Sequence, residues 1–383
     1  MKIAVARETI PGERRVALTP DQVSRLVKKG WEIAVESGAG QTSLSSDQDY
    51  IDAGATIVGD RQALWQSGDI LVKVSSPTAE EIQLLPEGSI MASLLNPLGQ
   101  PEVMQQLADK KITALGMELI PRTSRAQSMD VLSSQAGVAG YKAVLMAAAA
   151  LPKFFPMLTT AAGTIRPAKV FIIGAGVAGL QAIATARRLG AIVEAFDIRP
   201  AVKEEVQSLG AKFVEVALEE ETATAGGYAK EVSEDSKKKS QELIAKHVAT
   251  SDVVITTAQV PGRKAPVLVT DSMIAEMKPG SVIVDLAGEQ GGNCEGCEAG
   301  RDVEVHGVTI IAPINLPSSV AVHASQMFAK NMSTLLQLLI PENEINLDFE
   351  DDILDSVCIT HQGEVRNQRV KDALIKMTAP ANV

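Results

Sequence analysis

A glycine-rich segment, Gly174–Gly179, carries the most specific chemical signal in the sequence. Its letters, GAGVAG, give a G-x-G-x-x-G spacing; the apolar run Lys169–Ile173 precedes it and the helical-period segment Leu180–Leu189 follows it. Asp197 stands 18 positions after the last glycine, at the end of another apolar run. In such a strand–turn–helix unit, the glycines allow a tight turn, a close approach of backbone amides to a pyrophosphate, and packing of the helix on the strand. This context favours a dinucleotide site over a structural glycine turn that binds no ligand.

The acidic residue after the second strand bears on which dinucleotide fits. The carboxylate of Asp197 can accept hydrogen bonds from both ribose hydroxyls and would repel a 2′-phosphate, which favours NAD over NADP. Arg199 lies two residues later, and its cation could contact a phosphate, which weakens that preference. The candidate cofactor-binding residues of this region are Gly174, Ala175, Gly176, Val177, Gly179, Asp197, Ile198, Arg199 and Gln259.

The elements that must position these residues follow from an alternation of apolar runs and helical-period segments along nearly the whole chain. One series of expected strands is Lys2–Ala6, Glu32–Glu36, Ile70–Val74, Ser89–Leu94 and Thr113–Met117. A second series is Lys169–Ile173, Ile192–Phe196, Lys212–Val216, Asp252–Thr257, Ser281–Leu286 and Thr309–Ala312. Expected helices include Asp21–Lys29, Gln100–Asp109, Leu180–Leu189 and Thr270–Met277. This alternation predicts an α/β fold with two doubly wound, Rossmann-like parallel sheets.

Two long helical stretches suggest how the chain passes between the two sheets. Ser128–Phe155 lies between the two series of strands, and Ser318–Leu339 follows the second series. We expect both helices to cross between domains, so that Pro341–Val383 completes the N-terminal domain. The expected domains are therefore residues 1–130 plus 320–383, and residues 131–319, with the dinucleotide site in the latter.

Composition excludes several classes of protein. The chain of 383 residues has 47 acidic and 36 basic side chains, a net charge of −11, which disfavours binding to nucleic acid. Only 3% of the residues are aromatic, so platforms for base stacking are not expected. Cys294 and Cys297 form a single C-x-x-C without a second pair, so no metal site is predicted. The N-terminus reads as a strand instead of a signal peptide, and a soluble protein is expected.

Several longer segments carry a resemblance to a known family. They are Gly12–Pro20 (GERRVALTP), Arg122–Gln135 (RTSRAQSMDVLSSQ), Ala225–Glu231 (AGGYAKE) and Gly280–Glu295 (GSVIVDLAGEQGGNCE), besides the glycine motif. Together they resemble the NAD(H)-binding component, the first portion of the alpha subunit, of proton-translocating NAD(P) transhydrogenase, which is related to alanine dehydrogenase. The resemblance extends from Lys2 to about residue 375. Because the chain ends before any membrane helix, it resembles the split form of the alpha subunit.

The resemblance implies a division of labour between subunits. NADH binds to this component, and NADP(H) binds to a membrane-embedded beta subunit. A hydride passes directly between the two nicotinamides, coupled to proton translocation. The resemblance also implies a homodimer, located in the cytoplasm and docked peripherally on the inner face of the membrane through its partner subunits. Direct transfer needs positioning and no general acid or base, because no proton moves at the reacting carbons.

Site residues follow from the same resemblance. Arg122, Gln127, Asp130 and Ser133 surround the nicotinamide end: Asp130 and Ser133 hydrogen-bond the carboxamide, and Arg122 contacts a phosphate or braces the loop. Gln127 orients a ribose and is the candidate catalytic residue, through positioning. On composition alone, this stretch could equally be a solvated link before an N-capped helix.

A second loop is expected to act as a lid. Ala217–Asp235 is 19 residues long with no predicted element of its own, and loops of that length in compact domains are usually functional or disordered. It leaves the carboxyl end of the third strand of the second series, on the cofactor side. We expect Gly227 and Tyr228 to approach the cofactor when the loop closes; a tolerated surface insertion is the alternative.

The main alternative function is an NAD-dependent amino-acid dehydrogenase of the alanine dehydrogenase type. Arg15 and Lys73 match the positions where that family clamps its substrate carboxylate. Leu95, however, stands where that family carries its catalytic histidine, and Glu289 replaces an aspartate. Loss of such a proton donor typically costs about 10²–10⁴-fold in rate. A non-enzymatic NAD-sensing module is a third reading.

Overall fold

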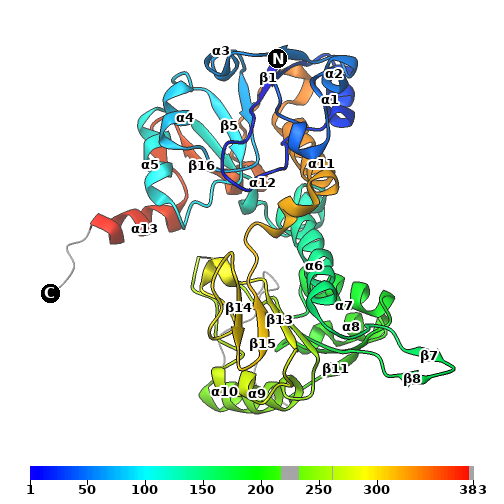
Figure 1. The fold of residues 1–383 in the computed structure, drawn as a ribbon. Helices are drawn as coiled ribbons and strands as arrows, with labels where there is room; N and C mark the ends of the chain where they lie inside the picture. The colour runs from blue at the N-terminus through cyan, green and yellow to red at the C-terminus, as the bar shows by residue number, and fades with distance from the viewer. Residues whose placement is uncertain (217–232, 261, 379–383) are drawn as a thin grey trace. The chain divides into compact units, whose positions relative to one another are not determined.

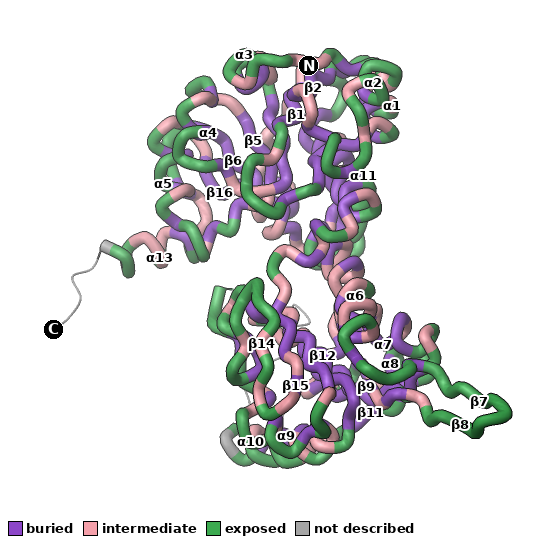
Figure 2. Tube along the Cα trace, in the orientation of Figure 1, coloured by how far each residue is buried: buried purple, intermediate pink, exposed green. Residues whose placement is uncertain are grey.

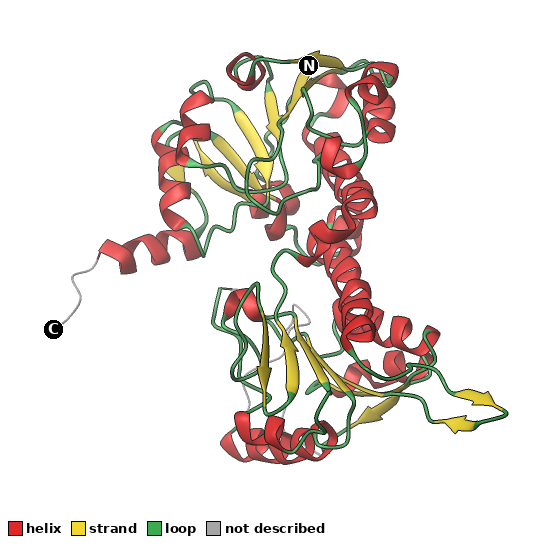
Figure 3. Ribbon diagram, in the orientation of Figure 1, coloured by secondary structure: helices red, strands yellow, loops and turns green. Residues whose placement is uncertain are grey.

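The computed structural model describes residues 1–216, 233–260 and 262–378. These residues group into two compact units (Figure 1). Unit 1 comprises Met1–Gln135 and Ser318–Val383, and unit 2 comprises Ala136–Pro317. Each unit is built on a largely parallel sheet with helices on both faces, which confirms the predicted α/β fold with two Rossmann-like sheets (Figure 3).

The sheet of unit 1 has the strand order β17-β16-β6-β5-β4-β1-β2-β3. The strands from β6 to β3 run parallel, whereas β16 pairs antiparallel with β6 and β17 antiparallel with β16. Their bounds are β1 Lys2–Val5, β2 Glu32–Glu36, β3 Thr56–Val58, β4 Ile70–Val72, β5 Ile90–Ser93, β6 Thr113–Gly116, β16 Cys358–His361 and β17 Glu364–Val365. The helices are α1 Pro20–Val27, α2 Asp47–Asp52, α3 Arg61–Trp65, α4 Ala79–Leu84, α5 Pro101–Asp109, α11 Ala321–Leu339, α12 Asp352–Val357 and α13 Gln368–Thr378.

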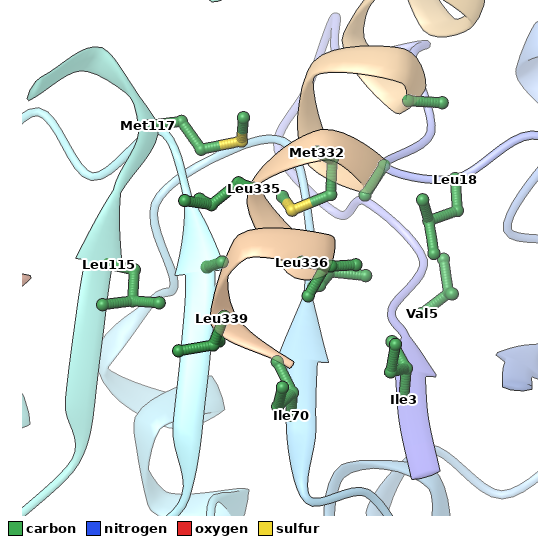
Figure 4. Packing of buried hydrophobic residues seen from close by; sticks show 14 of the residues in the cluster. Ile3, Val5, Leu18, Ile70, Leu115, Met117, Met332, Leu335, Leu336 and Leu339 are labelled. Atoms are coloured by element: carbon green, nitrogen blue, oxygen red, sulfur yellow. The ribbon is translucent and has the colours of Figure 1, made fainter. Parts of the chain in front are cut away.

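The strands of unit 1 are buried on both faces because successive residues point to opposite sides of the sheet. Ile3 and Val5 face one core, while Ala4 between them faces the other. Helix α11 fills the first core: Figure 4 shows its methionine and leucine side chains against β1, β4 and β6 (Figure 4). Residues after position 318 therefore supply part of the core of a sheet that begins at residue 2.

The sheet of unit 2 has the order β11-β10-β9-β12-β13-β15-β14, parallel except for the edge strand β14. The bounds are β9 Lys169–Ile173, β10 Ile192–Phe196, β11 Lys212–Val214, β12 Val253–Thr256, β13 Val282–Asp285, β14 Asp302–Val305 and β15 Val308–Ile311. The helices are α7 Val177–Arg188, α8 Lys203–Ser208, α9 Glu234–Val248 and α10 Asp271–Ala275. All of the longer strands appear as buried segments in Figure 2 (Figure 2). Strand order reverses between β9 and β12, the point at which doubly wound sheets bind ligands.

The chain passes from unit 1 to unit 2 along α6 (Val131–Ala150) and returns to unit 1 at Ser318, ahead of α11. The helical stretch expected over 128–155 is shorter than predicted. Before α6, residues Ser124–Met129 form the 3₁₀ helix η3, and Pro152 ends α6 because proline disfavours helix at the preceding residue.

Several short elements were not predicted from the sequence. They are the edge strands β3, β14, β16 and β17 and the exposed hairpin of β7 (Leu158–Thr160) and β8 (Gly163–Ile165). Within the described parts of the chain, no helix combines the length and apolar character needed to cross a bilayer. The same residues contain no cluster of three or more His, Cys, Asp or Glu side chains suited to a metal ion.

Candidate functional site

The turn between β9 and α7 is built around three glycines that no other residue could replace without displacement. Gly174 has φ +99°, and a Cβ on it would lie 2.5 Å from Oγ1 of Thr257. A Cβ on Gly179 would lie 1.9 Å from the carbonyl oxygen of Gly174. Gly176 is the N-cap of α7 and has no side chain to occupy the amides of the first helical turn. The helix therefore presents its N-terminal amides and its positive dipole end at the reversal point of the sheet.

Two neighbours hold this turn from outside the motif. The hydroxyl of Thr257, just after β12, donates to the carbonyl of Gly174 at 3.1 Å. Gly140 of α6 packs so closely on α7 that a Cβ there would lie 2.0 Å from the carbonyl oxygen of Ala178. Both contacts fix the first turn of α7 with backbone atoms, so the geometry of the turn is preorganised.

Asp197, directly after β10, is buried and joins the same turn. Its Oδ2 accepts a hydrogen bond from the amide of Ala175 at 2.7 Å, which ties the end of β10 to the glycine turn. Its two oxygens also accept bonds from Nε and Nη2 of Arg199, at 2.9 and 2.7 Å. This hydrogen-bonded pairing raises the pKa of the Arg199 guanidinium above its ordinary range. Asp197 therefore stands where the sequence placed it, with a cation already bound to it.

A buried carboxylate organises the loop after β13. Asp285 accepts hydrogen bonds from the hydroxyl of Thr256 and from the amides of Ala287, Asn293 and Cys294, at 2.7–2.9 Å. The buried side chain of Asn293 in turn accepts from the amide of Ala258 and donates to its carbonyl, at 3.0 and 2.8 Å. This network fixes the backbone beside the candidate residue Gln259.

Gln259 itself is exposed, and its Nε2 donates to the carbonyl of Leu286 at 2.6 Å. Cys294 is buried and Cys297 half-buried, and both are free thiols. Burial raises the pKa of the Cys297 thiol to about 11, so it is protonated at neutral pH. The C-x-x-C is therefore poorly suited to thiolate chemistry.

The loop carrying the other candidate residues belongs to unit 1. Ala126 and Met129 of η3 are buried in the core, whereas Arg122 and Gln127 are exposed. Asp130 accepts hydrogen bonds from the amide and hydroxyl of Ser133, at 2.9 and 2.6 Å. Asp130 thus caps the start of α6, which the sequence offered as the structural alternative for this stretch.

Two contacts from the C-terminal segment hold this loop. The buried side chain of Asn331 on α11 donates to the carbonyl of Ser128 at 2.9 Å and accepts from the hydroxyl of Ser134 at 2.7 Å. Arg125 pairs with Asp351 at 2.6 Å and also with Asp352 at the start of α12. The loop is anchored through its own backbone and Arg125, which leaves Gln127 at the surface.

The carboxyl ends of β1 and β4 in unit 1 carry buried charges. Lys73 is fully buried, with Nζ 2.7 Å from Glu81 and 3.9 Å from Glu8. Burial raises the pKa of Glu8 to about 7, although the charge of Lys73 lowers it. Arg15 is also buried and pairs with Glu13 at 2.6 Å while donating to Oε1 of Gln135 at 2.9 Å. The two cations that could clamp a carboxylate are thus both bonded to internal partners.

Leu95, at the position discussed for a catalytic histidine, is fully buried. Its amide donates to Oε1 of Glu118 at 2.8 Å, as does the amide of Asn96. Burial raises the pKa of Glu118 to about 7. Its other oxygen, Oε2, has no hydrogen-bond partner among the described residues.

Comparison with known proteins places these features in a family. The family Alanine dehydrogenase/PNT, N-terminal domain, matches residues 4–139, and the Alanine dehydrogenase/PNT, C-terminal domain, matches residues 143–368. The chain belongs to the alanine dehydrogenase/PNT family. This assignment confirms the resemblance inferred from the sequence motifs.

Individual relatives of this alanine dehydrogenase/PNT protein include both branches of the family. The chain is 47% identical over 374 residues to the first portion of the split NAD(P) transhydrogenase subunit alpha of Rhodospirillum rubrum, covering 95% of this chain and 97% of the relative. It is 32% identical over 384 residues to alanine dehydrogenase of Staphylococcus haemolyticus, covering 97% and 96%. The structure matches a transhydrogenase from Sinorhizobium meliloti with a TM-score of 0.85 and 43% identity, covering 96% and 99% of the two chains. This homology supports an NAD(P) transhydrogenase component of oxidoreductase type, with an NAD-binding Rossmann-like domain.

The structure brings some predicted site residues together and separates others by unit. The residues from Gly174 to Gly179, Asp197 to Arg199, and Gln259 gather at the carboxyl ends of β9, β10 and β12 in unit 2. Arg122, Gln127, Asp130 and Ser133 lie in unit 1. Gly227 and Tyr228, with most of the expected lid, lie outside the described residues.

Sequence reasoning missed the residues that brace the site. Asp285 could have been found, since it is a carboxylate at the end of a buried strand, as Asp197 is. Asn331 is a polar residue at helical spacing from Phe328 and Leu335, within the apolar stripe of α11. The bond from Thr257 to Gly174 had no sequence signal, because it joins residues 83 positions apart.

Proposed function

We propose that this chain is the NAD(H)-binding subunit of a proton-translocating NAD(P) transhydrogenase. In this proposal NADH bound here supplies a hydride directly to NADP bound on a partner beta subunit, and the transfer is coupled to proton translocation. The observation that carries the proposal is the turn between β9 and α7, with Asp197 bonded to the amide of Ala175. This arrangement suits a pyrophosphate and an adenosine ribose, in a chain 47% identical to a transhydrogenase alpha subunit.

The residues of this chain then act by binding and orientation. The amides at the start of α7 bind the pyrophosphate, and Asp197 accepts hydrogen bonds from the adenosine ribose. By the family resemblance, Asp130 and Ser133 bind the carboxamide and Gln127 orients the nicotinamide ribose toward the incoming partner. The anchoring of the loop by Asn331 and Arg125 suits such a role, because positioning requires a loop whose backbone is already fixed.

An alanine dehydrogenase activity is the second candidate, because Arg15 and Lys73 lie at the matching positions. Three observations disfavour it. Leu95 cannot transfer a proton, Arg15 is paired with Glu13, and Lys73 is paired with Glu81. A substrate carboxylate would have to displace an internal carboxylate from each cation in a buried setting, which is costly unless the displaced group is re-paired.

We also infer a homodimer that docks peripherally on the inner face of the membrane through its partner subunits. The hairpin β7–β8 supports self-association: all of its residues are exposed, and Met157 and Ile165 are 63% and 48% exposed. An isolated two-stranded hairpin is marginally stable in water, so we expect a protein surface to cover it. Sedimentation equilibrium should show a dimer, and replacement of Met157 and Ile165 by serine should weaken it. A monomeric wild-type chain would contradict this inference.

The deciding experiment mixes the purified chain with the NADP-binding domain of its partner subunit. Hydride exchange between NADH and an NADP analogue should appear only when both are present. Gln127→Asn should slow the exchange and leave NADH affinity nearly unchanged, whereas Gln62→Asn, an exposed glutamine on α3, should change neither. Deamination of alanine by the chain alone would establish the second candidate instead. NADH binding without any exchange would favour a sensing module.

A further inference from the structure

The acceptor capacity of Asp197 is already filled by this chain. Its Oδ1 accepts from the amide and from Nε of Arg199, both at 2.9 Å, and its Oδ2 accepts from the amide of Ala175 and from Nη2 of Arg199, both at 2.7 Å. An ionised carboxylate offers about four lone-pair sites. These four donors match that capacity, and the carboxylate is only 6% exposed.

Ribose recognition therefore requires an exchange of donors. The amide of Ala175 belongs to the glycine turn, and the amide of Arg199 belongs to the backbone directly after β10, so neither can leave without moving the strand end. The guanidinium of Arg199 sits on a flexible side chain and contributes two of the four bonds. Its Nε and Nη2 donors match in number the two hydroxyls of an adenosine ribose.

We propose that Arg199 is an internal competitor of the adenosine ribose for Asp197 and thereby sets nucleotide affinity and specificity. This inference rests on the proposed function, because it takes the dinucleotide to bind at the β9–α7 turn. Binding of NADH displaces the guanidinium, and two ribose hydroxyls take its place on the carboxylate. The displaced cation remains attached two residues after Asp197, so it stays within reach of a 2′-phosphate and lowers the discrimination against NADPH.

The proposal predicts an effect opposite to that expected for a binding residue. Arg199→Ala removes the competitor and leaves Asp197 with two backbone donors, so NADH should bind roughly three- to tenfold more tightly. NADPH should bind more weakly to this variant, because the phosphate loses its cation, and the preference for NADH over NADPH should widen. Arg199→Lys should fall between wild type and Arg199→Ala, because an ammonium is a point charge that cannot donate in the fork geometry of a guanidinium.

Titration calorimetry of the full chain with NADH and with NADPH tests this. The variants are Arg199→Ala, Arg199→Lys, Asp197→Ala and the control Arg188→Ala, which removes an exposed cation from the last turn of α7. Thermal unfolding establishes that each variant is folded. The Nε–H signal of Arg199 in ¹⁵N-resolved NMR, identified by its loss in Arg199→Lys, gives a second readout: NADH should shift it as the fork opens.

The outcomes separate the proposal from the function on which it rests. If Asp197→Ala binds NADH as tightly as wild type, the site at the β9–α7 turn is wrong and the proposed function fails with it. If Asp197→Ala weakens NADH while Arg199→Ala also weakens it or leaves it unchanged, the site stands and the competitor role is overturned. An Nε–H signal of Arg199 that ignores saturating NADH would likewise overturn that role.

Discussion

Two glycines on α6 should respond in opposite ways to the same substitution. A Cβ on Gly137 would meet no atom within 4 Å, whereas a Cβ on Gly140 would lie 2.0 Å from the carbonyl oxygen of Ala178. Each change to alanine gains helix propensity of about 1 kcal/mol. For Gly140 the clash is with backbone, so α6 and α7 must separate by about 1 Å before the contact reaches even 3.0 Å. We expect Gly137→Ala to stabilise unit 2 and Gly140→Ala to destabilise it relative to that control.

Because both variants share the propensity gain, the difference between them isolates the overpacking at Gly140. Overpacking of a rigid contact costs roughly 1–3 kcal/mol, which corresponds to a difference in Tm of about 2–12 °C for a domain of this size. Thermal unfolding followed by circular dichroism measures the difference. Ala178 lies in the first turn of α7, so Gly140→Ala should also weaken NADH binding, and Gly137→Ala should not. Equal stabilisation by both substitutions would show that the α6–α7 contact is not as close as the structure has it.

Three further predictions concern buried polar groups. Asp285→Asn replaces an acceptor of four hydrogen bonds by a group that can accept fewer, so urea denaturation should show a loss of about 1–3 kcal/mol in the free energy of unfolding; an unchanged midpoint would contradict the bracing role. Asn331→Leu should lower the rate of hydride exchange more than NADH affinity, because it frees the backbone of the loop at Ser128, and kinetics with the partner domain would refute this if only affinity fell. Glu118 has its pKa raised from 4.5 to about 7, so the unfolded chain releases this proton first and stability should fall between about pH 4.5 and 7; Glu118→Gln should flatten that fall and be the more stable protein at pH 8 by up to about 3 kcal/mol, as unfolding at pH 5 and pH 8 would show.

The central strands could be predicted from the sequence because their burial on both faces leaves a continuous apolar run. The structure places β2, β9 and β10 at the predicted residues, and the glycine turn after β9 lies where its spacing indicated. The edge strands were missed for the same physical reason. Strand β14 (DVEV) has an exposed face and alternates polar with apolar residues over only four positions, which is too short for a period to be recognised.

The braces of the candidate site escaped prediction because they join residues far apart in the chain. Asn331 contacts Ser128 across 203 positions, and only the folded unit makes them neighbours. The pairing of Asp197 with Arg199 is local, and the sequence placed both residues, yet their partnership depended on side-chain conformation. The spacing of Asp197 after the glycines predicted a ribose acceptor, but no spacing could indicate that the acceptor was already occupied.

The placement of α11 in unit 1 has a consequence for synthesis on the ribosome. Unit 2, residues 136–317, interrupts unit 1, so 182 residues must be translated between α6 and the segment that begins at Ser318. At roughly 5–20 residues per second, this takes about 10–40 s. Throughout that time the face of the first sheet that α11 later covers, including Ile3, Val5 and Ile70, lacks its native partner. We therefore expect the nascent N-terminal half to recruit chaperones until α11 emerges, while unit 2 can fold as soon as its own last strand is made.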